Sequence, residues 1–224
     1  MSMRPNNSII FDLDGTLIDS LPGIEFSVRE AFATLNLPIR IDDLRDLIGP
    51  PIRNILATVG DLSDEPTLSA LENAFRASYD SAGWRKTVCF PGVETALREM
   101  RARDWRLIIV TNKPETIALR ILEHLRILHY FESVLTRDSH TGEFFSKDAM
   151  VRSLMETYCI EPENCFMAGD TMEDAQAAAK AGIDFAYMTY GYGRIEEFAR
   201  VPVAYRLGSF EKLLPLSKKE LVHD

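Results

Sequence analysis

The sequence predicts an α/β fold in which a doubly wound parallel sheet is interrupted by an inserted all-helical domain. Five short apolar runs are expected to form strands, and they are continuous rather than alternating, as in strands that are buried on both faces. Amphipathic helical patterns separate the later runs, and strands that alternate with helices are typical of parallel sheets with right-handed crossovers. The interval between Phe11 and Leu107 breaks this alternation, because it contains helical patterns only.

The boundaries of the expected elements follow from these runs. The strands are 8–11, 107–110, 133–135, 165–168 and 185–188. The helices of the same domain are 94–101, 116–128, 147–158 and 173–181. Gly182 follows the last of these helices, where glycine commonly ends a helix because it adopts a positive φ without strain.

Two apolar stripes at helical spacing occupy the long interval after the first strand. One contains Ile24, Val28, Ala31, Phe32 and Leu35, and the other contains Leu68, Leu71, Ala74 and Phe75. A structureless connection of this length is uncommon in a compact domain. We therefore expect residues 17–87 to form a helical cap domain, and residues 1–16 and 88–224 to form the core.

Composition and charge limit the kinds of partner. The chain has 25 Lys and Arg residues against 34 Asp and Glu residues, so its formal net charge is −9. An acidic balance argues against nucleic-acid or anionic-membrane binding, which usually needs a basic surface, but one local positive pocket would admit an anionic small molecule. The three cysteines are scattered and no histidine pair has metal-ligand spacing, so we expect neither a disulfide framework nor a zinc site. We also expect a cytoplasmic protein, because the sequence has no long apolar stretch and no signal peptide.

Polar residues that follow the expected strands are the candidates for a functional site. In an open α/β sheet, ligands bind beyond the carboxyl ends of the strands. The residues at this edge are Asp12 and Asp14 after the first strand, Thr111, Asn112 and Lys113 after the second, and Asp170 and Asp174 after the fourth. Lys147 begins the helix that precedes the fourth strand.

These residue types suit the transfer of a phosphoryl group. Clustered carboxylates repel one another unless a cation joins them, and Mg²⁺ favours one or two carboxylates, water and a substrate phosphate oxygen. Lys147, the Thr111 hydroxyl and the backbone N–H groups near Asn112 would complete a phosphate cradle. An ionised aspartate that faces a metal-bound phosphoryl group is a nucleophile, and a second acid can protonate the leaving oxygen and then activate water.

Four motifs in order carry a resemblance to a known family. The segments DLDGTLIDS, VTNK and GDTMEDAQAAAKAG, with Lys147 between the last two, resemble the signature motifs of the haloacid dehalogenase-like hydrolase superfamily. FDLDGTLIDSLPG, a helical insert and FPGV are similar to its phosphoglycolate phosphatase-like branch. The resemblance covers nearly the whole chain, and it implies a Rossmann-like doubly wound parallel sheet core with an inserted all-helical cap domain.

The resemblance implies a role for each of the acids. Asp12 matches the nucleophile that forms an aspartyl-phosphate, and it also matches a carboxylate ligand of Mg²⁺. Asp14 matches the general acid/base, and its backbone carbonyl would ligate the metal. Asp170 matches the second carboxylate ligand. Asp174 matches an acid that holds metal-bound water or Lys147, although it could instead be an ordinary first-turn helix acid.

The phosphate-binding residues follow in the same way. Thr111 matches the phosphate-binding hydroxyl, and Asn112 lies beside it with its N–H group. Lys147 matches the lysine that neutralises the phosphate and the nucleophile. It departs from many relatives in lacking a proline-rich stretch after it, so Lys113 stays a rival for this role.

Two further segments have both a structural and a functional interpretation. Residues 48–53 form a Gly/Pro-marked turn that resembles the family's cap specificity loop, in which Arg53 could meet a substrate carboxylate or a second phosphate. The alternative is a plain turn between helices with a solvent-facing arginine. Residues 191–193 could be a loop at the edge of the site, but we expect a simple turn, and we expect Glu173 to be solvated.

The function that these observations and the resemblance imply is a magnesium-dependent phosphatase. Its partner would be a small phosphorylated metabolite, a phosphate monoester such as a phosphoglycolate-like compound or a nucleotide or sugar phosphate, and the protein would be a monomer or homodimer. A phosphomutase or pyrophosphatase of the same superfamily is an alternative. A phospho-accepting signalling or binding domain is the non-enzyme alternative. A dehalogenase is disfavoured, because such enzymes lack an acid at the position of Asp14.

Overall fold

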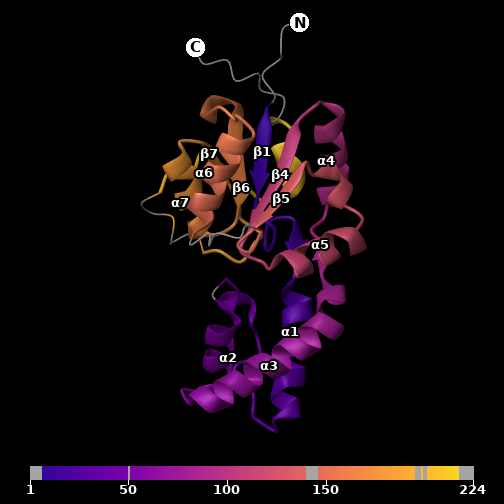
Figure 1. The fold of residues 1–224 in the computed structure, drawn as a ribbon, viewed down its shortest axis with the longest axis vertical. Coiled ribbons are helices and arrows are strands. Elements are labelled where there is room, and N and C mark those ends of the chain that lie inside the picture. The colour runs from indigo at the N-terminus through magenta and orange to yellow at the C-terminus, as the bar shows by residue number, and fades with distance from the viewer. Residues whose placement is uncertain (1–6, 50, 140–145, 195–197, 199–200, 217–224) are drawn as a thin grey trace, which may run out of the picture. The chain divides into compact units, whose positions relative to one another are not determined.

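The computed structural model describes residues 7–49, 51–139, 146–194, 198 and 201–216 (Figure 1). The chain forms two compact units. The first, which we call the core unit, consists of Met1–Ile18 and Cys89–Asp224, and the second, the cap unit, consists of Asp19–Val88. Pro50, in the expected specificity loop, lies outside the described residues.

The core unit is built on a six-stranded parallel sheet. Its strands, in spatial order, are β5 (Ser133–Thr136), β4 (Arg106–Thr111), β1 (Ser8–Phe11), β6 (Cys165–Gly169), β7 (Asp184–Met188) and β8 (Tyr205–Leu207). The chain runs from β1 outward to β5, and then returns beside β1 and runs outward in the other direction. The point at which the strand order reverses therefore lies between β1 and β6, which is where ligands bind in doubly wound sheets.

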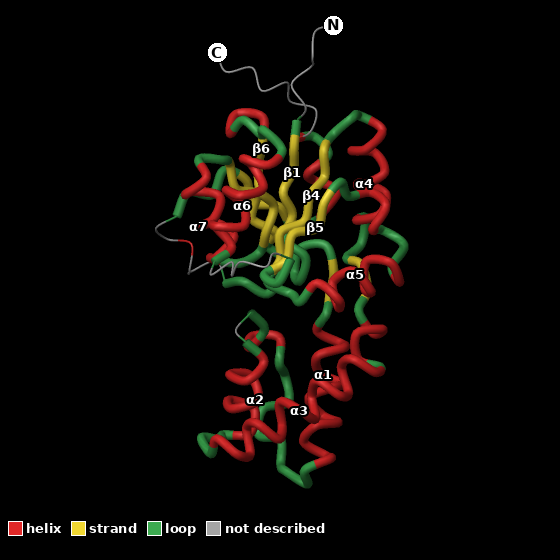
Figure 2. The backbone as a smooth tube through the Cα atoms, in the orientation of Figure 1, coloured by secondary structure: helices red, strands yellow, loops and turns green. Residues whose placement is uncertain are grey.

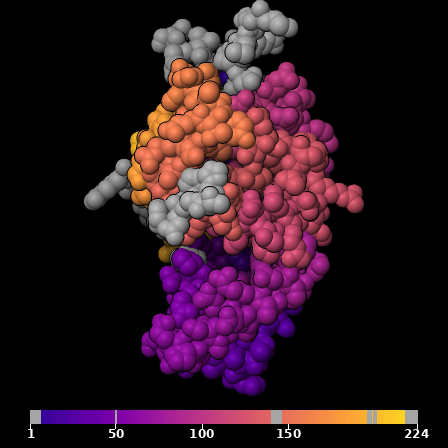
Figure 3. All heavy atoms as spheres, viewed as in Figure 1, coloured from indigo at the N-terminus to yellow at the C-terminus, as the bar shows by residue number. Residues whose placement is uncertain are grey.

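Helices cover both faces of this sheet (Figures 1 and 2). The helices are α4 (Val93–Ala102), α5 (Glu115–His124), α6 (Lys147–Thr157) and α7 (Met172–Ala181). Ile10 belongs to a buried cluster with side chains of α6 and α7. The next residue, Phe11, points to the other face, where its ring lies 5.6 Å from that of Phe210. All four residues of β1 are buried, and in the view of Figure 3 later segments of the chain lie in front of this strand.

The predicted α/β class is confirmed, with two differences in detail. The sheet has a sixth strand, β8, which is short, lies at the edge and has no continuous apolar run. The helix expected over 116–128 ends at His124, because Arg126 adopts a left-handed φ of 58° and the N–H of Ile127 turns back to the carbonyl of Leu122. The apolar periodicity continues beyond the point at which the backbone leaves the helix.

The cap unit is helical. Its helices are α1 (Leu21–Thr34), α2 (Ile52–Gly60) and α3 (Glu65–Ser81), and α3 packs against both of the others. The expected stripes are its buried faces, with Val28 and Phe32 of α1 and Leu71 of α3 almost fully buried. The short strands β2 (Ile18–Asp19) and β3 (Val88–Cys89) pair where the chain passes between the units. Within the described residues, none of the helices has the length and apolar character needed to span a membrane.

Candidate active site

The register of the sheet brings the residues that follow β1, β4 and β6 to one edge. Phe11 of β1 is level with Ile109 of β4 and with Ala168 of β6. The backbone N–H of Asp12 donates to the carbonyl oxygen of Ala168 at 2.9 Å. Because these parallel strands end within two residues of one another, the residues that follow them lie at the same edge although they are far apart in the sequence.

Three acids form a buried cluster at this edge. Carboxylate oxygens of Asp12, Asp170 and Asp174 all lie within 4.8 Å of one another, and all three residues are buried. The ammonium group of Lys147, also buried, donates to Asp12 Oδ1 at 2.6 Å and to Asp174 Oδ1 at 2.7 Å. The structure therefore brings four of the sequence-predicted site residues into direct proximity.

Lys147 owes its position to the start of α6. Ser146 caps this helix by accepting the N–H of Ala149, so Lys147 is its first residue. A positive charge at a helix N-terminus is unfavourable, because this end of the helix dipole is itself positive. The two carboxylates that face the lysine outweigh this cost.

Lys113, the rival lysine, has a different partner. Its ammonium group lies 2.9 Å from Asp14 Oδ1, and its backbone N–H donates to the hydroxyl of Thr111 at 3.1 Å. The side chain of Asp14 is 26% exposed, so this pair is more open than the Lys147 cluster. Lys147 therefore pairs with Asp12 and Asp174, whereas Lys113 pairs with Asp14.

Asp174 uses its two oxygens differently. Oδ1 accepts Lys147, whereas Oδ2 accepts the backbone N–H of Thr171 at 2.9 Å and its hydroxyl at 2.6 Å. The backbone N–H of Asp174 in turn donates to the Thr171 hydroxyl, which completes a capping box at the start of α7. Asp174 is thus both a capping residue of α7 and a partner of Lys147.

Two contacts of the site carry no signal in the sequence. The side-chain amide of Asn112 donates to Glu173 Oε2 at 2.8 Å, and this bond joins the loop after β4 to the start of α7. Glu173 is exposed, as expected, and this hydrogen bond is an additional contact. Asp170 Oδ2 accepts the backbone N–H groups of Tyr192 at 2.7 Å and Gly193 at 3.4 Å, so residues 191–193 are more than a simple turn.

Burial and mutual repulsion raise the pKa values of the acids. The pKa of Asp12 lies well above its ordinary value, because burial disfavours its charge and Asp174 and Asp170 add repulsion that Lys147 only partly offsets. Burial, helped by Asp174, raises the pKa of Asp170 to about 7, although the N–H groups of Tyr192 and Gly193 oppose this shift. Burial lowers the pKa of Lys147, but Asp12 and Asp174 outweigh it, so the net shift is upward.

The donor set fits a hard divalent cation. Three buried carboxylates face one lysine, so negative charge remains uncompensated in this cluster. Carboxylate oxygens are the ligands that Mg²⁺ prefers. Asp12 and Asp170 could bind such an ion directly, while Asp174, which holds Lys147 and caps α7, could act through water.

Arg53 lies in the cap unit, near the start of α2. Its guanidinium group donates to Glu72 Oε2 at 3.1 Å and also pairs with Glu65, and both of these acids belong to α3. The arginine is therefore engaged with α3 rather than simply solvent-facing. This network holds α2 against α3 and leaves the guanidinium side chain 30% exposed.

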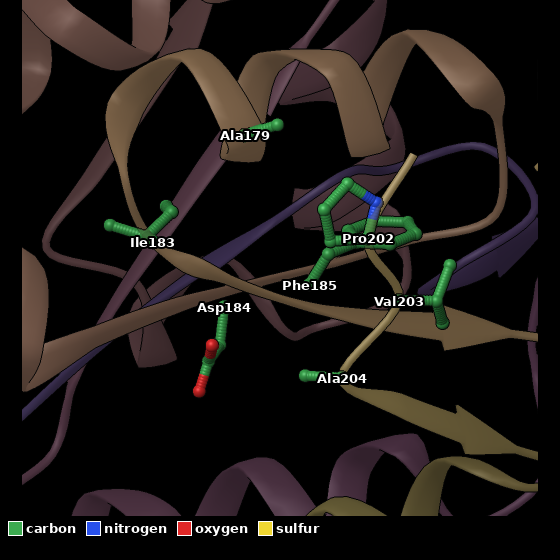
Figure 4. Close-up of a pocket in the computed structure, with 7 residues that line it drawn as sticks. All are labelled: Ala179, Ile183, Asp184, Phe185, Pro202, Val203 and Ala204. Atoms are coloured by element: carbon green, nitrogen blue, oxygen red, sulfur yellow. The ribbon is translucent and has the colours of Figure 1, made fainter. Parts of the chain in front are cut away.

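A pocket in the core unit lies away from the acid cluster (Figure 4). It is at the start of β7, and therefore at the opposite end of the parallel strands from the acids. Its lining is mainly apolar, with one acid, and consists of Ala179, Ile183, Asp184, Phe185, Pro202, Val203 and Ala204. These residues offer no cationic side chain and only a single carboxylate, so we do not assign the phosphoryl chemistry to this pocket.

Comparison with known proteins identifies the family. Residues 9–188 match the model of the haloacid dehalogenase-like hydrolase family. The chain belongs to this family. The predicted resemblance is confirmed. Three of the four motifs supply Asp12, Lys147, Asp170 and Asp174, whereas the motif VTNK supplies Lys113, which pairs with Asp14.

The relatives are named for different activities. The chain is 37% identical over 190 residues to the tyrosine-protein kinase PtkA of Mycobacterium tuberculosis. The match covers 84% of this chain but 64% of the kinase, so the chain spans less than two thirds of that relative. It is 31% identical to the phosphoglycolate phosphatase of Nitrosospira multiformis, covering 84% and 85% of the two chains. A solved haloacid dehalogenase-like hydrolase from Streptococcus pneumoniae matches with a TM-score of 0.81 and 26% identity, covering 94% of this chain and 97% of that one.

The raised pKa of Asp170 predicts a pH dependence of stability. The folded protein holds a proton on this group up to about pH 7, whereas the unfolded chain releases it near pH 3.9. The free energy of unfolding of the metal-free protein should therefore fall as pH rises between these values, by about 2–3 kcal/mol from pH 5 to pH 8. In Asp170→Asn this contribution should disappear.

Urea unfolding in EDTA at pH 5 and pH 8 measures this difference. Asp184→Asn, at an exposed carboxylate of the same unit, is the matched control and should behave as the unmodified protein. If Asp170→Asn and the unmodified protein lose the same free energy between the two pH values, the assignment of a raised pKa to Asp170 is wrong.

Proposed function

We propose that the protein is a magnesium-dependent phosphatase that hydrolyses a small phosphate monoester through an aspartyl-phosphate on Asp12. The observation that carries this proposal is the buried cluster in which Lys147 contacts Asp12 and Asp174 while Asp170 faces both acids. The phosphoglycolate phosphatases among the relatives support it, because they match most of both chains.

The reaction would proceed in two displacements on phosphorus. In the first, a carboxylate oxygen of Asp12 attacks the phosphorus, the bond to the ester oxygen breaks, and Asp14 donates a proton to the leaving alcohol. In the second, Asp14 takes a proton from water, which attacks the same phosphorus and releases inorganic phosphate and the Asp12 carboxylate. Asp14 is open enough to reach both the leaving group and water, whereas Asp12 is buried.

The other residues would bind and orient the phosphoryl group. The Thr111 hydroxyl and the backbone N–H of Asn112 would donate to its oxygens, and Lys147 would neutralise charge that develops in the transition state. Asp12, Asp170 and the backbone carbonyl of Asp14 would hold Mg²⁺, with Asp174 acting through water. When bound, the ion would offset the repulsion between the phosphate and the nucleophile.

The substrate class rests on the relatives and on the cap unit. A phosphoglycolate-like monoester is the first candidate, because several relatives of 30–32% identity are phosphoglycolate phosphatases. Nucleotide and sugar phosphates use the same core chemistry, as would a phosphomutase or a pyrophosphatase. The cap unit, residues 17–87 in our sequence-based division, would choose among them through loops such as the one before α2.

A protein kinase is the second candidate function, and the similarity to PtkA favours it. A kinase would transfer a phosphoryl group from a nucleotide to a tyrosine hydroxyl instead of to water. Both reactions need the same neutralisation of phosphoryl charge. Incubation with γ-labelled ATP and a tyrosine-containing peptide tests the kinase. Label in the peptide supports the kinase, whereas an unlabelled peptide together with phosphate release from a monoester supports the phosphatase.

Removal of the Asp12 carboxylate should abolish turnover. The measurement is inorganic phosphate release from phosphoglycolate, nucleoside monophosphates, sugar phosphates and pyrophosphate, with Mg²⁺, with EDTA and with Ca²⁺. We expect release with Mg²⁺ only, and a fall in kcat of about a thousandfold or more in Asp12→Asn, as for other nucleophiles. Ca²⁺ should substitute poorly because it prefers more ligands at longer distances. Undiminished release by the variant would refute the nucleophile assignment.

The two lysines should respond differently to substitution. Lys147→Gln leaves buried carboxylates without their partner, so we expect a loss of about 3–5 kcal/mol in unfolding free energy and a loss of vanadate or phosphate inhibition. Lys113→Gln breaks a more exposed pair and should cost about 1 kcal/mol or less, with inhibition retained. Loss of phosphate binding in Lys113→Gln alone would assign the phosphate lysine to Lys113.

Arg53 remains a predicted contact for the substrate. Arg53→Ala should raise KM for the best substrate about tenfold with little change in kcat, since a charge-assisted hydrogen bond contributes about 1.5–3 kcal/mol. Arg76→Ala is the matched control, because Arg76 also pairs with Glu72, at 2.8 Å. If both variants have the KM of the unmodified protein, Arg53 does not contact the substrate and only joins α2 to α3.

A further inference from the structure

The segment that follows β7 holds one carboxylate oxygen of Asp170. The backbone N–H groups of Tyr192 and Gly193 point at Oδ2, at 2.7 and 3.4 Å. Oδ1 has a different environment, in which the Thr16 hydroxyl donates to it at 3.3 Å. Two main-chain donors thus fix the orientation of a carboxylate that is completely buried.

At Gly191 and Gly193 the segment approaches Asp170 too closely for a side chain. A Cβ atom at Gly191 would lie 2.3 Å from the Cβ of Asp170, and one at Gly193 would lie 1.8 Å from its carbonyl oxygen. Neither glycine is among those with a positive φ. Glycine is therefore needed at these two positions because the backbone lies so close to Asp170, and not because the backbone adopts an unusual conformation.

Two tyrosines anchor this segment at its ends. The hydroxyl of Tyr187, within β7, donates to the carbonyl of Gly193 at 2.8 Å. The hydroxyl of Tyr190 donates to the carbonyl of Thr16 at 2.7 Å, and its ring lies 4.6 Å from that of Phe90. The segment is therefore tied both to the sheet and to the turn that carries Asp12 and Asp14.

We propose that residues 190–193 are a positioning element that orients Asp170 for a divalent cation. By occupying Oδ2, the two N–H groups leave Oδ1 as the oxygen that we assign to the ion, and they favour the ionised carboxylate that binding requires. Groups that orient a metal ligand typically change metal affinity ten- to a hundredfold when they are altered. This inference rests on the proposed function in so far as a cation binds at the acid cluster.

Gly191→Ala tests the inference through binding of Mn²⁺, which is followed as loss of the free-ion EPR signal without substrate. We expect Mn²⁺ affinity to fall ten- to a hundredfold. At saturating Mg²⁺, kcat and the KM for the ester should recover, which a general disruption of the fold would not allow. Gly208→Ala is the matched control, because a Cβ there meets nothing closer than 3.8 Å, and it should bind Mn²⁺ as the unmodified protein does.

Tyr190→Phe provides a second variant in case Gly191→Ala does not fold. It removes the hydrogen bond to Thr16 and keeps the ring, and we expect a several-fold loss of Mn²⁺ affinity. If the folded variants bind Mn²⁺ as tightly as the unmodified protein while Asp170→Asn does not bind it, the positioning role is overturned and the cation site stands. If the unmodified protein itself binds no Mn²⁺, the cation site fails, and the inference fails with it.

Discussion

The buried ammonium of Lys147 is the interaction on which the site depends. It lies 2.6 Å from Asp12 and 2.7 Å from Asp174, which come from the end of β1 and the start of α7. Without it, mutually facing carboxylates would be buried with no positive partner, at a cost of several kcal/mol. Because the three residues come from separate elements, the site exists only when α6 and α7 are packed on the sheet.

The main chain does much of the remaining positioning. Asp174 is both the capping acid of α7 and a partner of Lys147, so the contacts that begin this helix also fix the position of the acid. Asp170 is held by backbone N–H groups from the segment after β7, and that segment fits only because its glycines lack side chains. A site arranged in this way has little freedom to reorganise, which favours a fixed electrostatic environment for a highly charged group.

Membership of the family does not identify the acceptor of the phosphoryl group. The relatives include phosphoglycolate phosphatases and a tyrosine-protein kinase. A shared fold does not determine the substrate, since specificity depends on the groups that surround the reacting phosphate. In the cap unit, Arg53 is paired with acids of α3, so any role with a substrate competes with that network.

The sequence by itself determined the α/β class, five of the six core strands and the candidates Asp12, Asp170, Asp174 and Lys147, because continuous apolar runs and residues at strand ends are local patterns. Only the tertiary structure decided which lysine faces Asp12, where the helix after β4 ends, and that Asn112 meets Glu173. The edge strand β8 and the contact of residues 191–193 with Asp170 also required it. These features join residues far apart in the chain, and their geometry depends on packing, which leaves no periodic signal in the sequence.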